Sequence, residues 1–264
     1  MALKQHKDDR VRFEQQVDNS RSYVLPFVTR TKQIESETKI LEIGCGEGGV
    51  LVPFAEIGCR CTGVDLDKIR IDLANGFLAD FVKIGQVEFL YKNVYDDDFL
   101  GQYKNYFDLI ILKDVIEHIP DQELFIPYLK NLLKRDGQIF FGFPPWYMPF
   151  GGHQQVASRK LSMLPYYHIL PKPLYRRLLK LFGESDRTIE DLMEIYDTRI
   201  SIERFERIIK KSGLQIKNKQ HFLLNPIYKY KFGWNPVKQS RIISSIPFAR
   251  NFLTTCVYYT VGIS

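Results

Sequence analysis

The chain has 264 residues, of which 45% are hydrophobic and 14% are aromatic. This length and apolar fraction suit one large domain with a full core, or a core domain that carries one sizeable insertion. The formal net charge of +6 indicates an anionic partner only weakly, because modest positive charge mostly keeps proteins soluble.

The sequence shows neither a secretory signal nor a membrane-spanning run. Its N-terminal stretch, MALKQHKDDRVRFEQQ, is polar and lacks an apolar core. No stretch reaches about 18 uninterrupted apolar residues, and the nearest candidate, 242–263, contains Pro247, Arg250 and Asn251. The four cysteines follow no paired zinc spacing, which favours a reduced cytoplasmic chain. We therefore expect a cytoplasmic protein that is at most peripheral to a membrane.

The predicted elements begin with one or two helices within residues 11–28. From about residue 38 to 143, short apolar runs alternate with helical patterns, which is typical of βαβ units in a parallel sheet. The run FDLIIL is almost wholly apolar, as expected for a central strand buried on both faces. The predicted strands of this core are 39–43, 60–64, 87–91, 107–112 and 138–143, and the predicted helices are 49–57, 67–82 and 121–133.

The alternation stops after the fifth predicted strand. Residues 144–198 are rich in proline, tyrosine and basic side chains and are interpreted as an insertion. Regular structure resumes with a helix that begins after Ser201, a good N-cap, and stops at Gly213. Two strand-like runs follow, 214–223 and 251–262, joined by a long basic loop.

The strongest motif is LEIGCGEGG, which joins the first predicted strand to the first core helix. Glycines at such a turn allow unusual backbone angles and let a ligand lie against bare main chain. Gly44, Gly46 and Gly49 match G-x-G-x-x-G, the dinucleotide fingerprint, but a lone match of this type is weak. A nicotinamide-dependent oxidoreductase therefore stays an alternative at this point.

Polar residues near the strand ends separate the alternatives. Glu42 lies inside the first strand, where an apolar residue would be ordinary. Asp65 ends the second strand, where its carboxylate can accept both ribose hydroxyls of an adenosine ligand. Asn93 and Val94 follow the third strand, where an adenine ring needs a polar edge contact and an apolar wall.

The segments E-x-G-C-G-x-G, Val64-Asp65 and FDLIILKDVIEHIPD resemble the class I S-adenosylmethionine-dependent methyltransferases, most nearly the ubiquinone-biosynthesis O-methyltransferase group. The resemblance implies an α/β fold: a Rossmann-like, seven-stranded, mostly parallel sheet with helices on both faces, a C-terminal antiparallel strand and a helical lid insertion. Within a single domain, it divides the chain into N-terminal helices (1–37), a cofactor-binding core (38–143), the lid (144–198) and a final helix with two strands (199–264).

The resemblance also implies S-adenosylmethionine as the cofactor. Glu42 and the glycines line its methionine end, Asp65 holds the ribose, and Asn93-Val94 meets the adenine. In related enzymes the N-terminal helices close over the cofactor, so Arg21 or Tyr23 could reach the methionine carboxylate, although ordinary packing explains Tyr23 just as well. The predicted cofactor-binding set is Tyr23, Glu42, Gly44, Cys45, Gly46, Gly48, Asp65, Leu66, Asn93, Val94, Lys113 and Asp114.

The DVIEHI segment follows the central strand, at the edge where open α/β sheets bind ligands. The spacing of Asp114, Glu117 and His118 resembles a metal-binding segment of small-RNA 2′-O-methyltransferases and some quinone O-methyltransferases, and His153 could approach the same edge. These four residues would suit a divalent cation. Alternatively, Glu117 and His118 shape the loop, or His118 or His153 is a metal-free general base. His118, His153 and Asp114 are the candidate catalytic residues.

Two features of the insertion bear on the methyl acceptor. FPPWYMPF lacks the polar first residue of base N-methylating enzymes and is expected to form a stiff apolar wall of the acceptor pocket, with Gly151-Gly152 as a flexible joint. Residues 157–187 hold seven basic and two acidic side chains. A helix there would place Leu174, Leu178, Leu181 and Phe182 on one face, which would either pack as a lid or lie on an anionic membrane.

The sequence thus predicts a methyltransferase that acts on an oxygen nucleophile of a small or lipid-like acceptor, such as a quinone, phenol, lipid or glycan precursor. A metal-dependent RNA 2′-O-methyltransferase is a rival, although no recognised RNA module argues for nucleic acid. A nicotinamide-dependent oxidoreductase or a binding-only relative is the other. Neither the acceptor's identity nor the oligomeric state follows from the sequence.

Overall fold

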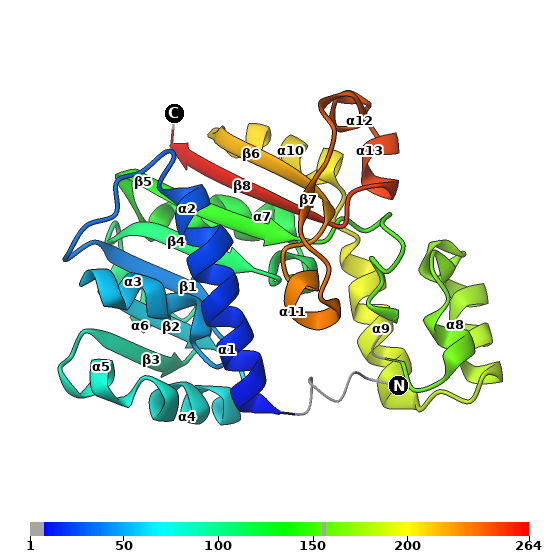
Figure 1. Ribbon diagram of the computed structural model, residues 1–264, viewed down its shortest axis with the longest axis horizontal. Coiled ribbons are helices and arrows are strands. Elements are labelled where there is room, and N and C mark those ends of the chain that lie inside the picture. Colours follow the sequence, from blue (N-terminus) through cyan, green and yellow to red (C-terminus); the bar gives the residue numbers. More distant parts are fainter. Residues whose placement is uncertain (1–7, 155–156, 264) are drawn as a thin grey trace.

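The computed structural model describes residues 8–154 and 157–263 (Figure 1). An eight-stranded sheet has the order β3-β2-β1-β4-β5-β8-β6-β7. The strands from β3 to β5 are parallel, whereas β8 pairs antiparallel with both β5 and β6. The strands are β1 (Lys39–Ile43), β2 (Arg60–Asp65), β3 (Val87–Tyr91), β4 (Phe107–Lys113), β5 (Leu133–Phe143), β6 (Leu214–Leu224), β7 (Val237–Lys238) and β8 (Cys256–Ile263).

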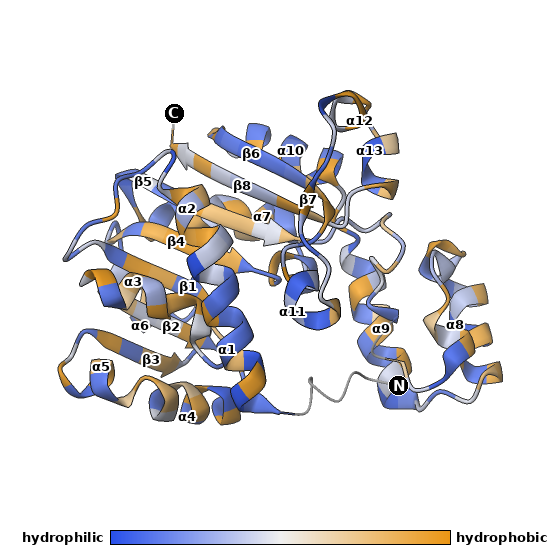
Figure 2. Cartoon of the chain, in the orientation of Figure 1, coloured by the Kyte–Doolittle hydropathy of each residue, from blue (hydrophilic) through white to orange (hydrophobic). Residues whose placement is uncertain are grey.

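Helices cover both faces of the sheet, and each face has its own apolar core. The central strands are the most hydrophobic part of the fold, as Figure 2 shows for β4 and β5. One face packs against α1 (Asp9–Asn19), α2 (Leu25–Val28), α3 (Val52–Ile57), α4 (Lys68–Phe77) and α5 (Ala79–Lys83). The other packs against α6 (Asp97–Tyr103), α7 (Gln122–Tyr128) and α10 (Ile202–Lys211).

Local signals placed most core elements correctly. The α/β fold and the antiparallel C-terminal strand are confirmed, and the Asp67 side chain caps α4 by accepting from the backbone of Ile69 and Arg70. Ser201 likewise caps α10. The predicted helix 67–82 is divided into α4 and α5 at Leu78, where the backbone leaves helical geometry. Helix α6 and the two-residue edge strand β7, the eighth of the sheet, were not predicted.

The helix predicted at 121–133 is also shorter in the structure. It ends at Tyr128, a 3₁₀ turn covers Leu129–Asn131, and β5 already begins at Leu133. Pro127 lies inside α7 and has no amide hydrogen to donate to the preceding turn, which accounts for the early end.

The insertion forms a small helical unit beside the carboxyl ends of the parallel strands (Figure 1). Helices α8 (Lys172–Leu181) and α9 (Asp186–Thr198) pack around an apolar cluster of their own. The predicted face of α8 is only partly packed in the insertion: Leu178 and Phe182 are half-buried, Leu174 and Leu181 are 44% and 76% exposed, and the fully buried residues are Tyr175 and Leu179. Packing against α9 and the Trp146 segment selects the face, and the helical spacing of leucines alone does not reveal this.

The connection between β6 and β8 is more structured than the predicted basic loop. It contains α11 (Tyr228–Phe232), α12 (Arg241–Ser245) and α13 (Ala249–Phe252) in addition to β7. In Figure 1, α11 lies in front of the sheet between α1 and α9, and α12 and α13 form a separate projection, the α12–α13 tip (residues 241–253). No helix in the described ranges is both long and apolar enough to cross a membrane.

Candidate active site

The glycine loop has the geometry that the motif predicts. Gly44, Gly46 and Gly48 all have positive φ, at 68°, 53° and 80°. At Gly44 a Cβ would lie 2.6 Å from Val115 Cγ2, and at Gly48 it would lie 2.6 Å from the ring of Phe89. Both the backbone angle and the space therefore require glycine at these two positions.

Asp65, at the end of β2, is hydrogen-bonded to this loop. Its Oδ2 accepts from the Gly46 amide at 2.8 Å, and its Oδ1 accepts from the Asp67 amide at 2.9 Å. A carboxylate has about four lone-pair positions, so these two bonds leave Asp65 able to accept from ligand hydroxyls.

Three charged groups line the cavity beyond the loop. Glu42 is buried, and burial, followed by the charge of Asp65, raises the pKa of its carboxyl well above the usual value. Within the described residues its Oε2 has no hydrogen-bond partner. Burial lowers the pKa of Lys113, but its ion pair with Asp114 outweighs that effect, and the net shift is upward.

These groups surround a cavity of about 220 Å³ over the carboxyl ends of β1, β2 and β4. Seven of the predicted cofactor-binding residues line it: Glu42, Gly44, Cys45, Gly46, Asp65, Lys113 and Asp114. Gln16, Asn19, Val50, Arg70 and Ile227 complete the lining.

The other predicted cofactor residues lie elsewhere. Tyr23 lines a different cavity, with Phe27 and Tyr258, and Arg21 pairs with Glu56 at the surface, so the structure does not place either at the methionine end. Gly48 acts through loop geometry rather than as lining. The remaining three do not line the cavity: Leu66 is 68% exposed, Asn93 is exposed, and Val94 is buried in the core.

Sequence reasoning placed the N-terminal helices at the cofactor but missed Gln16 and Asn19 of α1, and Ile227 just before α11. Asn19 is buried, its Oδ1 accepts from Tyr258, and among described side chains its Nδ2 has no partner. Gln16 accepts from the Gly49 amide at 3.2 Å. A polar residue inside a predicted helix gives no local signal of this kind, because only the docking of α1 on the glycine loop turns these amides toward the cavity.

Buried Glu47 explains how α1 is docked. Its carboxylate forms ion pairs with Arg12 of α1 and Arg70 of α4, and it accepts from Gln16 at 3.1 Å. A buried charge is tolerated only when it is paired and hydrogen-bonded. The network therefore ties the N-terminal helix to the cofactor loop.

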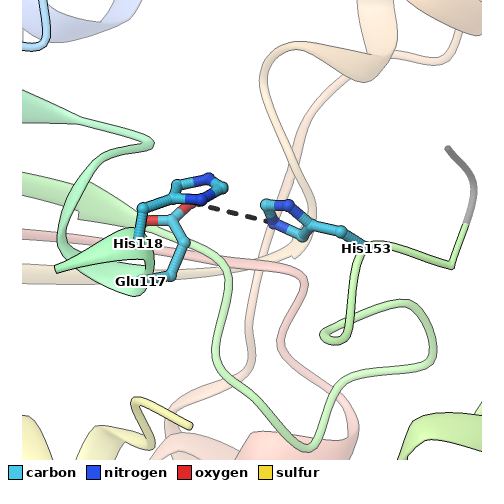
Figure 3. A group of neighbouring side chains, drawn as sticks. All are labelled: Glu117, His118 and His153. Atoms are coloured by element: carbon cyan, nitrogen blue, oxygen red, sulfur yellow. Dashed lines mark ion pairs between the residues drawn. The ribbon is translucent and has the colours of Figure 1, made fainter. Parts of the chain in front are cut away.

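The DVIEHI segment brings Glu117 and His118 next to His153 (Figure 3). The nearest ligand atoms of these three side chains all lie within 4.8 Å of one another. The Glu117 carboxylate is 3.9 Å from His153 Nε2, and the two imidazole rings are 5.1 Å apart between centroids. The turn is fixed by Gln122, which donates to the carbonyl of Ile116 at 2.8 Å.

Burial lowers the pKa of both imidazoles and raises the pKa of the carboxyl in this group, so it favours the neutral form of all three side chains. Burial, followed by the charge of Asp114, raises the pKa of Glu117. Among the described groups, neither Glu117 oxygen has a hydrogen-bond partner. Burial and the neighbouring His118 lower the pKa of His153 to about 4, and burial of its ring also lowers the pKa of His118.

Three residues at this edge, Asp114, Asp121 and His153, have left-handed backbones that are rare outside glycine. Asp114 and His153 both have φ of 56°. Such strain concentrates at functional sites, where surrounding contacts hold the residue in place. Asp114, predicted as a fourth metal ligand, is not in the cluster with Glu117, because its carboxylate is paired with Lys113.

The unpaired buried carboxylate and two neutral imidazoles are a donor set that fits a divalent transition metal. A cation would satisfy the Glu117 oxygens, and neutral imidazole is the form that binds metals. The same residues without a metal would present a neutral imidazole as a proton acceptor.

A second cavity lies on the far side of His118. It is lined by His118, Pro120, Asp121, Glu194, Asp197, Thr198 and Arg204. Three carboxylates face one arginine there, and Arg204 is itself paired with Glu123. The excess of negative charge in this cavity would repel the phosphate backbone of a nucleic acid.

The proline-rich wall differs from its prediction. Trp146 is buried, and it packs edge-on against His168 and Tyr196 in the core of the insertion. A Cβ at Gly151 would lie 2.0 Å from the Trp146 carbonyl oxygen, and one at Gly152 would lie 2.4 Å from His168 Cβ. The two glycines are a close-packed contact, which corrects the expectation of a flexible joint.

Comparisons with known proteins identify the family of the chain. A family model described as "Methyltransferase domain" matches residues 15–197. The ubiquinone biosynthesis O-methyltransferase of Histophilus somni (strain 2336) is 30% identical over 53% of this chain and 60% of its own length. That of Glaesserella parasuis serovar 5 is 32% identical over 39% of this chain and 43% of its own length. The chain thus spans less than two thirds of these relatives.

Solved structures show the same fold at low identity. The phosphoethanolamine N-methyltransferase 2 of Haemonchus contortus, in complex with S-adenosyl-L-methionine, has a TM-score of 0.54 and 15% identity, and covers 90% of this chain and 51% of its own. The geranyl diphosphate C-methyltransferase of Streptomyces coelicolor A3(2) has a TM-score of 0.56 and 15% identity, and covers 92% and 79%. These enzymes methylate different elements, so the likeness concerns the fold alone.

Proposed function

Since the chain belongs to the methyltransferase-domain family and is an S-adenosylmethionine-dependent methyltransferase, we propose that it methylates a hydroxyl oxygen of a small or lipid-like acceptor. The observation that carries this proposal is the continuity between two sites. Asp114 lines the cofactor cavity, and its charge acts on Glu117, His118 and His153. The donor methyl and a proton acceptor would therefore meet at one edge of the sheet.

The reaction needs alignment and the removal of one proton. The acceptor oxygen attacks the methyl carbon in line with the sulfonium, the sulfur–carbon bond breaks, and its electron pair stays on sulfur. The hydroxyl proton passes to a neutral imidazole nitrogen of His118 or His153. A neutral hydroxyl is a poor nucleophile, which is why an oxygen acceptor, more than an amine, benefits from such a group.

As the alternative to a histidine base, we propose that Glu117, His118 and His153 hold a divalent cation in the working enzyme; both imidazoles would then be ligands, and the acceptor hydroxyl would release its proton to solvent. The support is the buried Glu117 carboxylate, whose two oxygens find no hydrogen-bond donor in the described structure. Such a cation supplies Lewis acidity that lowers the pKa of an acceptor hydroxyl and holds a neighbouring oxygen. Asp114 would stay with Lys113, outside the ligand set.

The acceptor enters, in this proposal, through the cavity beside His118. Its carboxylates, Asp121, Glu194 and Asp197, disfavour RNA and suit an uncharged, hydroxyl-bearing ring or lipid head. The names of the curated relatives point to a phenolic oxygen in a quinone precursor. A phenol or catechol is therefore the first acceptor class to test.

The test is methyl transfer from labelled S-adenosylmethionine to a matched panel of a catechol, a phenol, an aromatic amine and a short RNA. We expect methylation of the oxygen acceptors, with at least about 100-fold loss of kcat in His118→Ala. S-adenosylhomocysteine binding, measured by calorimetry beside NAD, should be unchanged in that variant. Methylation of the amine alone, or of RNA, would contradict the proposed acceptor class while leaving the methyltransferase assignment intact.

A further inference from the structure

The connection between β6 and β8 exposes much apolar surface. Eight large apolar side chains are exposed within residues 232–253: Phe232, Trp234, Val237, Ile242, Ile246, Phe248, Phe252 and Leu253. Ile242 is 76% exposed and Phe248 69%, both in the α12–α13 tip. Several large apolar side chains exposed within one short segment, as in the α12–α13 tip, mark an interaction site.

Phe248 combines this exposure with backbone strain. Its φ of 62° and ψ of −53° are unfavourable for a bulky side chain. Contacts with α10 hold the strained residue in place. The Phe248 amide donates to Glu203 Oε1 at 2.9 Å, and Arg250 pairs with Glu203 and Glu206, each at 2.8 Å. The fold thus uses a buried ion-pair network to present an aromatic ring to the outside, which indicates a function for that ring.

The charge of the C-terminal segment, and of two cations at the tip itself, favours one kind of partner. Residues 207–264 contain ten lysines and arginines and no aspartate or glutamate, whereas the 206 residues before them hold more acidic than basic side chains. Lys238 precedes the tip and Arg241 is its first residue; both are exposed and have no ion-pair partner among the described residues. Apolar and aromatic side chains among unpaired cations fit an anionic lipid surface.

The insertion is a weaker candidate for the same role, although Leu174 and Leu181 of α8 are exposed. Several of its cations are already paired with neighbouring acids: Lys172 with Asp197, Arg176 with Glu190, and Lys180 with Asp186. Its positive charge is therefore largely balanced within the insertion.

We propose that the α12–α13 tip docks on an anionic membrane surface, with Ile242, Ile246 and Phe248 inserted among the lipids and Lys238 and Arg241 against the head groups. The tip is joined to the acceptor side of the enzyme, because Phe252 packs against Tyr147 at 5.5 Å and Tyr166 at 6.3 Å between ring centroids. Docking would place the segment that follows β5 next to the bilayer.

The test is co-sedimentation of the full chain with vesicles of phosphatidylcholine containing phosphatidylglycerol, and with vesicles of phosphatidylcholine alone. We expect binding to the anionic vesicles that weakens as salt is raised. The triple variant Ile242→Ser/Ile246→Ser/Phe248→Ser should partition at least about tenfold less. Lys238→Glu/Arg241→Glu should weaken binding to anionic vesicles selectively.

The matched control is Leu174→Ser/Leu181→Ser, which removes equally exposed leucines from α8 and should bind vesicles like the natural chain. Calorimetry with S-adenosylhomocysteine establishes that each variant is folded and does not depend on the acceptor. Absence of vesicle binding by the natural chain would overturn the proposal, as would unchanged binding by the triple variant or loss of binding in the α8 control. Concentration-dependent dimers that the triple variant abolishes, without vesicle binding, would assign the tip to a second copy instead.

Discussion

The two sides of this active site are built in different ways. On the cofactor side, the loop from Gly44 to Gly48 and the carboxylate of Asp65 lie within consecutive βα units, and Asp65 bonds directly to the loop. On the acceptor side, His118, His153 and the α9 carboxylates come from segments far apart in the chain. The cofactor side depends on backbone geometry, which local sequence records, whereas the acceptor side depends on how separate segments pack.

If Glu117, His118 and His153 bind a metal, a change at the Glu117 carboxylate should lower the metal affinity the most. Glu117→Gln keeps the shape of the side chain and removes the anionic ligand, so we expect at least about 100-fold weaker binding of Mn²⁺ or Zn²⁺ by calorimetry. Because Gln carries no charge to bury, the free energy of unfolding should not fall. Equal metal affinity in the variant would leave His118 and His153 as metal-free groups.

The packing of the insertion predicts the next largest effect. Leu179 is fully buried, and Leu179→Ala should lower the free energy of unfolding by about 3 kcal/mol in a denaturant titration. Leu181 is 76% exposed, and Leu181→Ala should change it by less than about 0.5 kcal/mol. If Leu181→Ala lowered the free energy of unfolding more than Leu179→Ala, the packed face of α8 would be the one that the leucine spacing alone predicts.

The cofactor side is tested at Asp65. Asp65→Ala removes the acceptor for ligand hydroxyls and the bond to the Gly46 amide, so the affinity for S-adenosylhomocysteine should fall about 10- to 100-fold. Asp65→Asn is the control: it keeps an oxygen for the Gly46 amide and should lose less. If Asn and Ala lose equally, the carboxylate charge, and not the loop bond, decides affinity.

The last prediction concerns the pH dependence of stability. Burial lowers the pKa of His168 to about 4, and its ring bridges the Trp146 carbonyl and the Gln154 amide, each at 2.7 Å. An unfolded histidine titrates near pH 6.5, so between these values the unfolded chain binds more protons and stability is lost as pH falls.

Relative to His168→Gln, which cannot titrate, the natural chain should lose about 1.4 kcal/mol per pH unit across that window. Thermal unfolding of both chains at several pH values measures the difference. A pH-independent difference would mean that His168 is accessible to protons in the fold.

These contrasts also explain what the sequence could predict. The caps at Asp67 and Ser201 and the apolar run of β4 are local signals, and each is confirmed in the structure. Tyr23 was placed at the cofactor by position in the chain, yet Asn19 and Gln16 line the cavity, because only the docked orientation of α1 selects them. The same holds for Gly151 and Gly152, because the turn and the fold bring Trp146 and His168 against them.

The place of β8 has a consequence for synthesis of the protein. This strand, the most C-terminal of the sheet, lies between β5 and β6 and pairs with both. Until residues 256–263 leave the ribosome, β5 and β6 each carry an open hydrogen-bonding edge, which invites wrong pairing with other chains. The nascent chain can therefore complete its cofactor loop early but stays prone to aggregation until β8 closes the sheet.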